Sequence, residues 1–149
     1  MTRGERFAKF PVFSGHMEGL PRATVEGFEE VPPPPDTFMG NETEWRVFWW
    51  LTREHVEFDF QSNLLGGRKM LGGQVADFII YSRDPALIVN VQGEYWHYLG
   101  GRLSAEALLN KVALMNRGFD VVYVREDDVL SRLDYTMKQA MLAIQLFLD

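Results

Sequence analysis

Cysteine is absent from this 149-residue sequence, which excludes disulfides and zinc sites built on thiolates. No apolar run approaches the roughly 20 residues needed to cross a bilayer, and no signal peptide opens the chain. Phosphate-binding P-loops, dinucleotide-binding glycine fingerprints and the Gly-x-Ser-x-Gly elbow of serine hydrolases are also missing. The 3 histidines are too scattered to indicate a zinc triad. We therefore expect a soluble, cytoplasmic protein that does not associate with membranes.

The composition that remains is that of one globular domain. Apolar residues make up 46% of the chain and aromatic residues 13%, enough for an ordinary core at this length. The formal net charge is −6, whereas proteins that bind nucleic acid avidly without sequence preference are usually basic. This charge is compatible with transient contact with nucleic acid and gives weight to a protein partner.

Residues 1–40 have the composition of an extended, proline-rich N-terminal arm. They contain Pro11, Pro21 and the run Pro32–Pro35, and four consecutive prolines form a stiff polyproline spacer that cannot join a helix or a central strand. Spaced apolar residues, such as Phe7 and Phe10, could dock on the domain or on a partner protein, and a disordered arm is equally consistent. We expect the folded domain to span residues 41–149.

Within that domain, two periodicities alternate along the chain. Asn41 and Glu44 form the pattern of a helical capping box, and the following residues are apolar nearly all round. Ser104 can cap a second helix, with Gly118 as its stop signal. The acidic run that begins at Glu126 is interpreted as the N-terminal cap of a last helix. The predicted strands are Val56–Gln61, Val75–Tyr81, Ala86–Gln92 and Phe119–Val124.

This order of elements predicts an α/β fold with a single mixed sheet flanked by helices. The first three strands are close enough in sequence to pair as antiparallel hairpins. The helix between the third and fourth strands implies a crossover and therefore a parallel fourth strand. The predicted order is helix, three strands, helix, strand, helix.

The segment from Gln74 to His97 carries the strongest indication of chemistry. Asp77 is set among apolar strand residues, and a carboxylate there is costly unless it is hydrogen-bonded or holds a cation. The neighbouring strand opens into Gln92-Gly93-Glu94-Tyr95-Trp96-His97, where polar and aromatic groups gather. Side-chain and backbone oxygens at that strand end could share a cation with Asp77. The pattern indicates a metal-dependent phosphodiesterase site.

On these residues the chain resembles the PD-(D/E)XK nuclease superfamily, whose core has the same order of elements. Asp77 in VADFIIY is similar to the metal-binding Asp of that superfamily, and LIVNVQG, residues 87–93, occupies the place of its E-x-K strand. The Gly-aromatic-Trp-His cluster that ends at His97 is most similar to the very-short-patch mismatch-repair endonucleases. The resemblance implies a restriction-endonuclease-like core and Mg²⁺ or Mn²⁺ as cofactor.

The chain departs from that pattern at two positions. Asn90 stands where most members have the acid of E-x-K, and Gln92 stands where they have Lys. Asn is a neutral, weaker ligand for a hard cation. The very-short-patch type uses a backbone carbonyl of this strand instead, which implies Asp77 and the Val91 carbonyl as metal ligands here. Those enzymes also bind zinc through Cys, so the subtype match is partial.

Each candidate residue has a functional and a structural interpretation. Asp77 is a metal ligand or an acid that accepts backbone N–H groups at a bend. His97 is a general base or acid, since an ordinary histidine side chain exchanges protons near neutrality, or it packs with Trp96. Gln92 orients a water or a phosphate oxygen, or it caps the strand end. Glu44 resembles the helical acid near the metal in this superfamily, although its capping role already explains it.

For Asn90 we weigh a ligand position against a hydrogen-bonding core residue, and favour the second. Arg68 and Lys69 lie in a glycine-flanked loop beside the predicted site, and glycines there allow a phosphate backbone to approach closely. The alternative for this loop is an ordinary solvated surface.

The sequence thus predicts a metal-dependent endonuclease that acts on DNA and is nicking or structure-selective. The alternative is a catalytically inactive nuclease fold that serves as a structural or protein-binding component of a larger assembly, such as a viral particle. The lost E-x-K pair, the acidic charge and the proline-stiffened arm favour that alternative.

Overall fold

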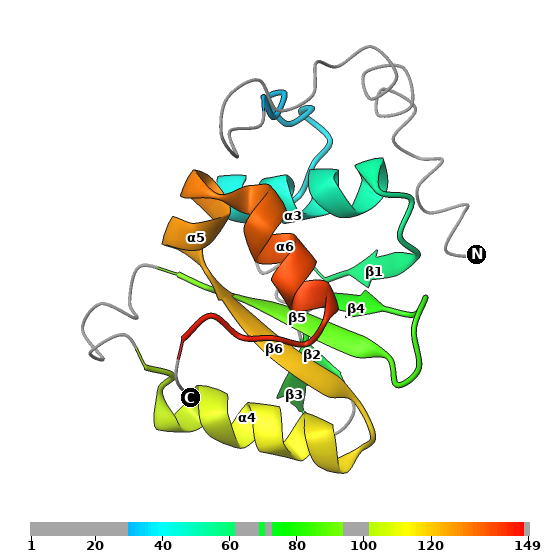
Figure 1. The fold of residues 1–149 in the computed structure, drawn as a ribbon, viewed down its shortest axis with the longest axis vertical. Helices are drawn as coiled ribbons and strands as arrows, with labels where there is room; N and C mark the ends of the chain where they lie inside the picture. The colour runs from blue at the N-terminus through cyan, green and yellow to red at the C-terminus, as the bar shows by residue number, and fades with distance from the viewer. Residues whose placement is uncertain (1–29, 62–68, 71–72, 94–101, 148–149) are drawn as a thin grey trace.

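A mixed four-stranded sheet with helices on both faces forms the centre of the protein (Figure 1). The computed structural model describes residues 30–61, 69–70, 73–93 and 102–147. The strand order in the sheet is β1-β4-β5-β6. These strands span Phe58–Phe60 (β1), Phe78–Ile80 (β4), Leu87–Gln92 (β5) and Asp120–Arg125 (β6).

The pairing of the strands confirms the predicted directions of the four main strands. β1 pairs with β4, and β4 with β5, in antiparallel fashion. β6 pairs with β5 in parallel, with Leu87 opposite Asp120 and Gln92 opposite Arg125. The parallel pair needs a crossover, and a helix between β5 and β6 provides it. The protein is therefore an α/β domain with one mixed sheet flanked by helices.

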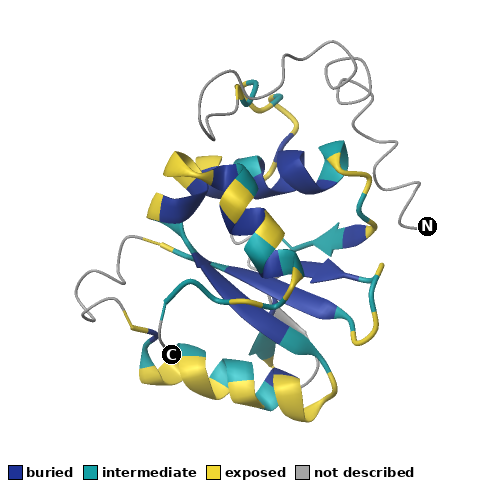
Figure 2. Ribbon diagram, in the orientation of Figure 1, coloured by how far each residue is buried: buried dark blue, intermediate teal, exposed yellow. Residues whose placement is uncertain are grey.

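Among the described elements, three helices cover one face of the sheet. The first, α3 (Glu42–Arg53), begins at the predicted capping box, in which the Asn41 side chain accepts from the Glu44 backbone N–H and the Glu44 side chain accepts from the Asn41 N–H. It is mostly buried, because the sheet packs beneath it and α5 (Glu126–Ser131) and α6 (Leu133–Met141) lie alongside (Figure 2). These elements enclose the larger hydrophobic core.

Helix α4 (Ala105–Asn116) covers the opposite face. Ser104 caps it as predicted, accepting a hydrogen bond from the Ala107 N–H. Gly118 follows the helix with a φ of +97°, a left-handed conformation that favours glycine and confirms the predicted stop. A smaller core lies between α4 and the sheet.

The predicted strand Val75–Tyr81 is wrong as one continuous strand. The chain bends at Asp77, so that β3 (Gln74–Val75) leaves the main sheet and pairs with β2 (Lys69–Met70), while β4 continues in the main sheet. Alternation along the sequence cannot reveal this bend, because both halves remain strand-like and only the pairing partner changes.

The predicted last helix is also interrupted. It breaks at Arg132, where φ is −151°, and α6 ends at Met141. The chain then passes the outer edge of β6, where the Gln145 side chain accepts from the Tyr123 N–H at 3.0 Å. Phe147 packs on the α4 side of the sheet and not with Met137 on the α6 side. This segment thereby gives a hydrogen-bond partner to a backbone N–H on the exposed edge of the sheet.

Part of the predicted N-terminal arm belongs to the folded unit. Val31 and Phe38 pack against the larger core, and the Trp45 indole N–H donates to the Pro32 carbonyl at 2.7 Å. Residues 1–29 lie outside the described residues. Among the helices that the structure describes, none has both the length and the apolar character required of a membrane span.

Candidate functional site

Asp77 lies at the bend between β3 and β4, and its backbone is fixed from two sides. Its N–H donates to the Asn90 side-chain oxygen at 2.7 Å, and its carbonyl accepts from the Gln61 N–H at 2.8 Å. The buried carboxylate accepts from the Val91 N–H at 2.8 Å. The acid is therefore held just beyond the point where β4 and β5 stop pairing.

Two asparagines hold the strand that precedes this bend. The Asn90 amide donates to the Val75 carbonyl at 2.9 Å, and so does the Asn110 amide of α4, also at 2.9 Å. The Asn110 side-chain oxygen accepts from the Val75 N–H at 2.6 Å. Val75 is thus bonded at both backbone groups by side chains, which compensates for the strand pairing that the bend removes.

Beside Asp77 is a pocket of about 160 Å³. Glu44 of α3 reaches it while one oxygen accepts the capping bond from the Asn41 N–H at 2.9 Å. Glu126, the first residue of α5, also lines it and accepts from the Thr43 hydroxyl at 3.2 Å. The complete lining is Asn41, Thr43, Glu44, Asp77, Val91, Gly93 and Glu126. Acidic residues from three separate segments therefore line one pocket.

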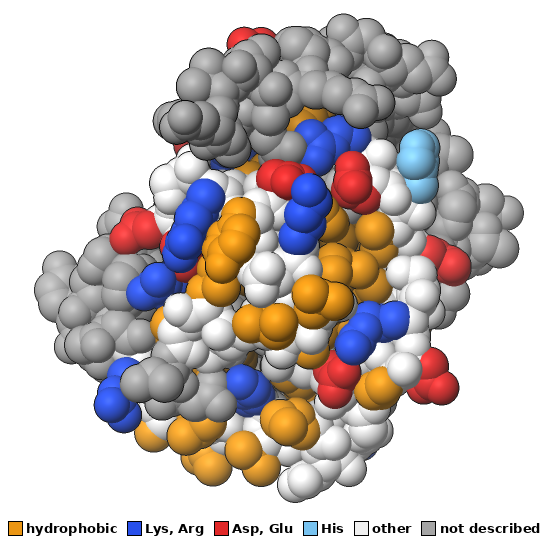
Figure 3. All heavy atoms as spheres, in the orientation of Figure 1, with side chains coloured by type: hydrophobic (Ala, Val, Ile, Leu, Met, Phe, Trp, Pro, Cys, Tyr) orange, Lys and Arg blue, Asp and Glu red, His pale blue; other side chains and the backbone are white. Residues whose placement is uncertain are grey.

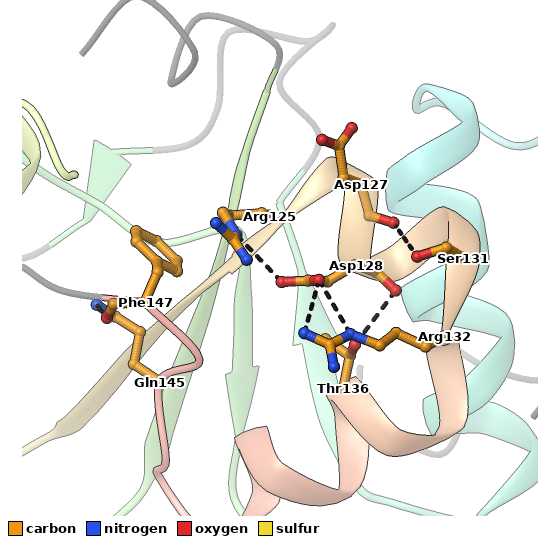
Figure 4. A network of polar contacts seen from close by, with 8 residues as sticks. All are labelled: Arg125, Asp127, Asp128, Ser131, Arg132, Thr136, Gln145 and Phe147. Carbon is orange, nitrogen blue, oxygen red and sulfur yellow. Dashed lines mark hydrogen bonds and ion pairs between the residues drawn. The ribbon is translucent and has the colours of Figure 1, made fainter. Parts of the chain in front are cut away.

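An ion-pair network fixes the helix that carries Glu126 (Figure 4). The largely buried Asp128 bridges Arg125 at the end of β6 and Arg132 at the end of α5, with nitrogen–oxygen distances of 3.1 Å to each. The Thr136 hydroxyl donates to the Asp128 carbonyl at 3.2 Å. The network joins β6, α5 and α6, and it sets the position of Glu126 at the pocket.

The structure brings together three of the residues predicted for the site. Asp77, Glu44 and Val91 all line the pocket. The Val91 N–H already points to Asp77, and the N–H and C=O of one strand residue lie on the same side of the strand. The Val91 carbonyl is therefore on the Asp77 side of the strand.

Other predicted residues lie elsewhere. Gln92 does not line the pocket, and alternation along β5 places its side chain with Ile88 on the face covered by α4. Asn90 holds the bend through both ends of its amide, which agrees with the favoured interpretation of a hydrogen-bonding core residue. Arg68 and His97 lie outside the described residues, and for Lys69 the backbone alone is described, in β2.

Sequence reasoning missed Glu126 as a pocket residue. It was interpreted only as a helix cap, although it directly follows β6, and the carboxyl ends of parallel neighbours such as β5 and β6 meet at one edge of a sheet. That rule was the available signal. Within the described ranges, no three His, Asp or Glu side chains are grouped closely enough to hold a metal ion by themselves.

Comparison with known proteins adds no assignment: no protein-family model, curated protein or solved structure matches this chain.

Proposed function

We propose that the pocket beside Asp77 binds a divalent cation and that the protein is a metal-dependent endonuclease of the PD-(D/E)XK type acting on DNA. One observation carries the proposal. Glu44, Asp77 and Glu126 come from three different segments of the chain, yet they line a single pocket. Carboxylates that share a small space repel one another when ionised, and a bound cation offsets that repulsion.

The chemistry of the lining suits a hard cation. Carboxylate oxygens and a backbone carbonyl are the ligands that Mg²⁺ and Mn²⁺ prefer, and Mg²⁺ usually keeps several waters and takes only one or two carboxylates. Asp77 and the Val91 carbonyl would hold the ion, with Glu44 and Glu126 close by. The incomplete set of protein ligands fits an ion that leaves positions for water and substrate.

A cation in the pocket would supply Lewis-acid polarisation of a phosphodiester bond and stabilise the charge that develops on it. The residues of the chain position the reacting groups. The Asn90 and Gln61 bonds fix Asp77, and the capping box fixes Glu44. By the sequence hypothesis, His97 takes the proton from the attacking water, and Arg68 and Lys69 contact the phosphate backbone.

A second function is favoured by the hydrogen bonds of the acids. Asp77 accepts from the Val91 N–H, Glu44 caps α3 and Glu126 accepts from Thr43. Each acid therefore has a structural task that requires no metal. On this basis the alternative is an inactive nuclease fold that acts as a structural component of a larger assembly, such as a viral particle.

The test compares the wild type with Asp77→Asn, because Asn can still accept the Val91 N–H bond while losing the charge. Asp120→Asn is the matched control, since Asp120 pairs with Arg83 at the opposite end of β6. Supercoiled plasmid, mismatched duplex and branched DNA are incubated with Mn²⁺ or Mg²⁺. We expect cleavage by the wild type and the control, and none by Asp77→Asn.

Thermal unfolding with and without Mn²⁺ separates cation binding from catalysis. An ion that binds only the folded state raises Tm, so the wild type and Asp120→Asn should be stabilised and Asp77→Asn should not. A Tm shift without cleavage supports a cation site in an inactive fold. If the wild type shows no Tm shift and no cleavage, the proposal is contradicted and the structural alternative is supported.

A further inference from the structure

Helix α4 has an apolar outer face that the described part of the chain does not cover. Of its residues, Leu114 alone is buried. The large hydrophobic side chains Leu108, Leu109, Val112 and Met115 are 37%, 70%, 46% and 51% exposed. In Figure 3, hydrophobic side chains gather along the lower edge of the molecule, where Figure 1 places α4. Contiguous apolar surface of this kind marks an interaction site.

Two pairs of residues that flank this face share one midpoint along the helix. At 3.6 residues per turn, Leu109 and Val112 lie at the centre of the outer face. Leu108 and Met115, about two turns apart, lie on one flank. The exposed Glu106 and Arg117, about three turns apart, lie on the other flank. The midpoint of each flanking pair is the same point of the helix, between Lys111 and Val112.

We propose that this face binds a second copy of the chain, with the two α4 helices packed antiparallel about a two-fold axis at that midpoint. One alignment of the two helices then forms the contacts on both flanks. Leu108 meets the partner's Met115, and Glu106 meets the partner's Arg117. Because the contact is isologous, each of these pairs occurs twice.

The charges favour this occupant over an unrelated apolar segment. Neither Glu106 nor Arg117 has a side-chain ion-pair partner within the part of the chain that the structure describes. The acid is in the first turn of α4, and Arg117 is its C-terminal cap. An antiparallel partner places opposite charges together, and it also places opposite ends of the two helix dipoles together. A parallel pair would instead oppose like charges.

The contact is small and the dimer is accordingly weak. One 12-residue helix presents less surface than the roughly 800 Å² per partner of a standard stable interface. The dimer should therefore depend on concentration, and the pocket beside Asp77 remains accessible because α4 covers the other face of the sheet from α3.

Cross-linking of the full chain tests the proposal directly. The sequence has no cysteine, so Val112→Cys introduces a single thiol close to the two-fold axis. With diamide as oxidant, two such thiols lose two protons and two electrons to form one disulfide. We expect a species of twice 17.2 kDa on non-reducing gels. The matched control is Leu130→Cys, on α5 and 39% exposed, which should stay monomeric.

Charge exchange tests the register. Glu106→Arg and Arg117→Glu should each raise the dimer dissociation constant, measured by sedimentation, by roughly fivefold. The double variant should return it to within about twofold of the wild type, because the pairs are restored with reversed sign. A monomeric Val112→Cys, equal cross-linking of the Leu130→Cys control, or a double variant weaker than either single one would overturn the proposal. In the first case the face would be covered by another occupant, such as residues 1–29.

Discussion

The amide pair that holds the Asp77 bend gives the sharpest test of the site's construction. Asn90 accepts from the Asp77 N–H at 2.7 Å and donates to the Val75 carbonyl at 2.9 Å. Asn110 donates to that same carbonyl at 2.9 Å. Leu has nearly the shape of Asn without its polar atoms. Asn90→Leu, Asn110→Leu and the double variant therefore remove these bonds singly and together.

The shared carbonyl determines the size of each effect. Asn90→Leu leaves the buried Asp77 N–H without its partner, at a cost of about 1–3 kcal/mol. The Val75 carbonyl keeps its Asn110 bond and adds no penalty. Asn110→Leu removes the bond from the Val75 N–H in a half-buried position and should cost about 1 kcal/mol. The double variant also orphans the carbonyl, so it should exceed the sum of the singles by about 1 kcal/mol.

Urea unfolding followed by tryptophan fluorescence measures these free energies. The chain has 4 tryptophans, and with a urea slope of about 1–3 kcal/mol per molar, the expected coupling shifts the midpoint measurably. If the losses of the two single variants add up to the loss of the double variant within about 0.3 kcal/mol, a shared carbonyl is refuted. A changed slope would instead indicate an altered unfolded or native state.

The variant Asn90→Asp tests whether this position can carry the acid of the E-x-K motif. Aspartate can still accept from the Asp77 N–H, but when ionised it places a carboxylate against the Val75 carbonyl and cannot donate to it. At pH 7 we expect a loss of at least about 1–3 kcal/mol in unfolding free energy. The loss should shrink as pH falls, because the protonated acid can donate. A fully stable variant at pH 7 would contradict this account.

Three further predictions concern the frame around the site. Asn41→Ala removes the side-chain half of the capping box and should lower the unfolding free energy by about 1 kcal/mol, measured by urea unfolding; no loss would contradict a working cap. Gly118→Ala places a side chain at a φ of +97° and should cost about 1–2 kcal/mol, while Tm unchanged within error would count against it. Burial raises the pKa of Asp134, but hydrogen bonds from Lys138 and Trp50 and the nearby cations Lys138 and Arg53 lower it by more. The net pKa is therefore below the usual 3.8. The contribution of the ionised Asp134 carboxylate to the free energy of unfolding is therefore present above that value. It is lost as pH falls through the lower pKa of the folded state. The Tm difference between wild type and Asp134→Asn should hold at neutral pH and shrink below about pH 4, and a difference independent of pH would refute the linkage.

Local signals in the sequence were enough for α3, α4 and the four strands of the main sheet, and for their order. Asn41, Ser104 and Gly118 mark helix ends through contacts with neighbours in sequence, so their roles could be predicted without the fold. The parallel pairing of β5 with β6 followed from the length of the connection, since a short turn cannot join parallel strands. Asp77 could be selected because an acid is costly among buried apolar residues, and Glu44 was a candidate only through its resemblance to the helical acid of the nuclease superfamily.

The tertiary structure decided what depends on partners distant in sequence. The strand predicted across Asp77 breaks because Val75 binds Asn110 of α4 and pairs with β2. Glu126 meets Glu44 at the pocket because α5 packs against α3, a contact between segments distant in sequence. Phe147 packs beside α4 because the chain crosses the edge of the sheet after α6. Local propensity identifies an element, whereas hydrogen bonds and burial between elements decide which side chains meet.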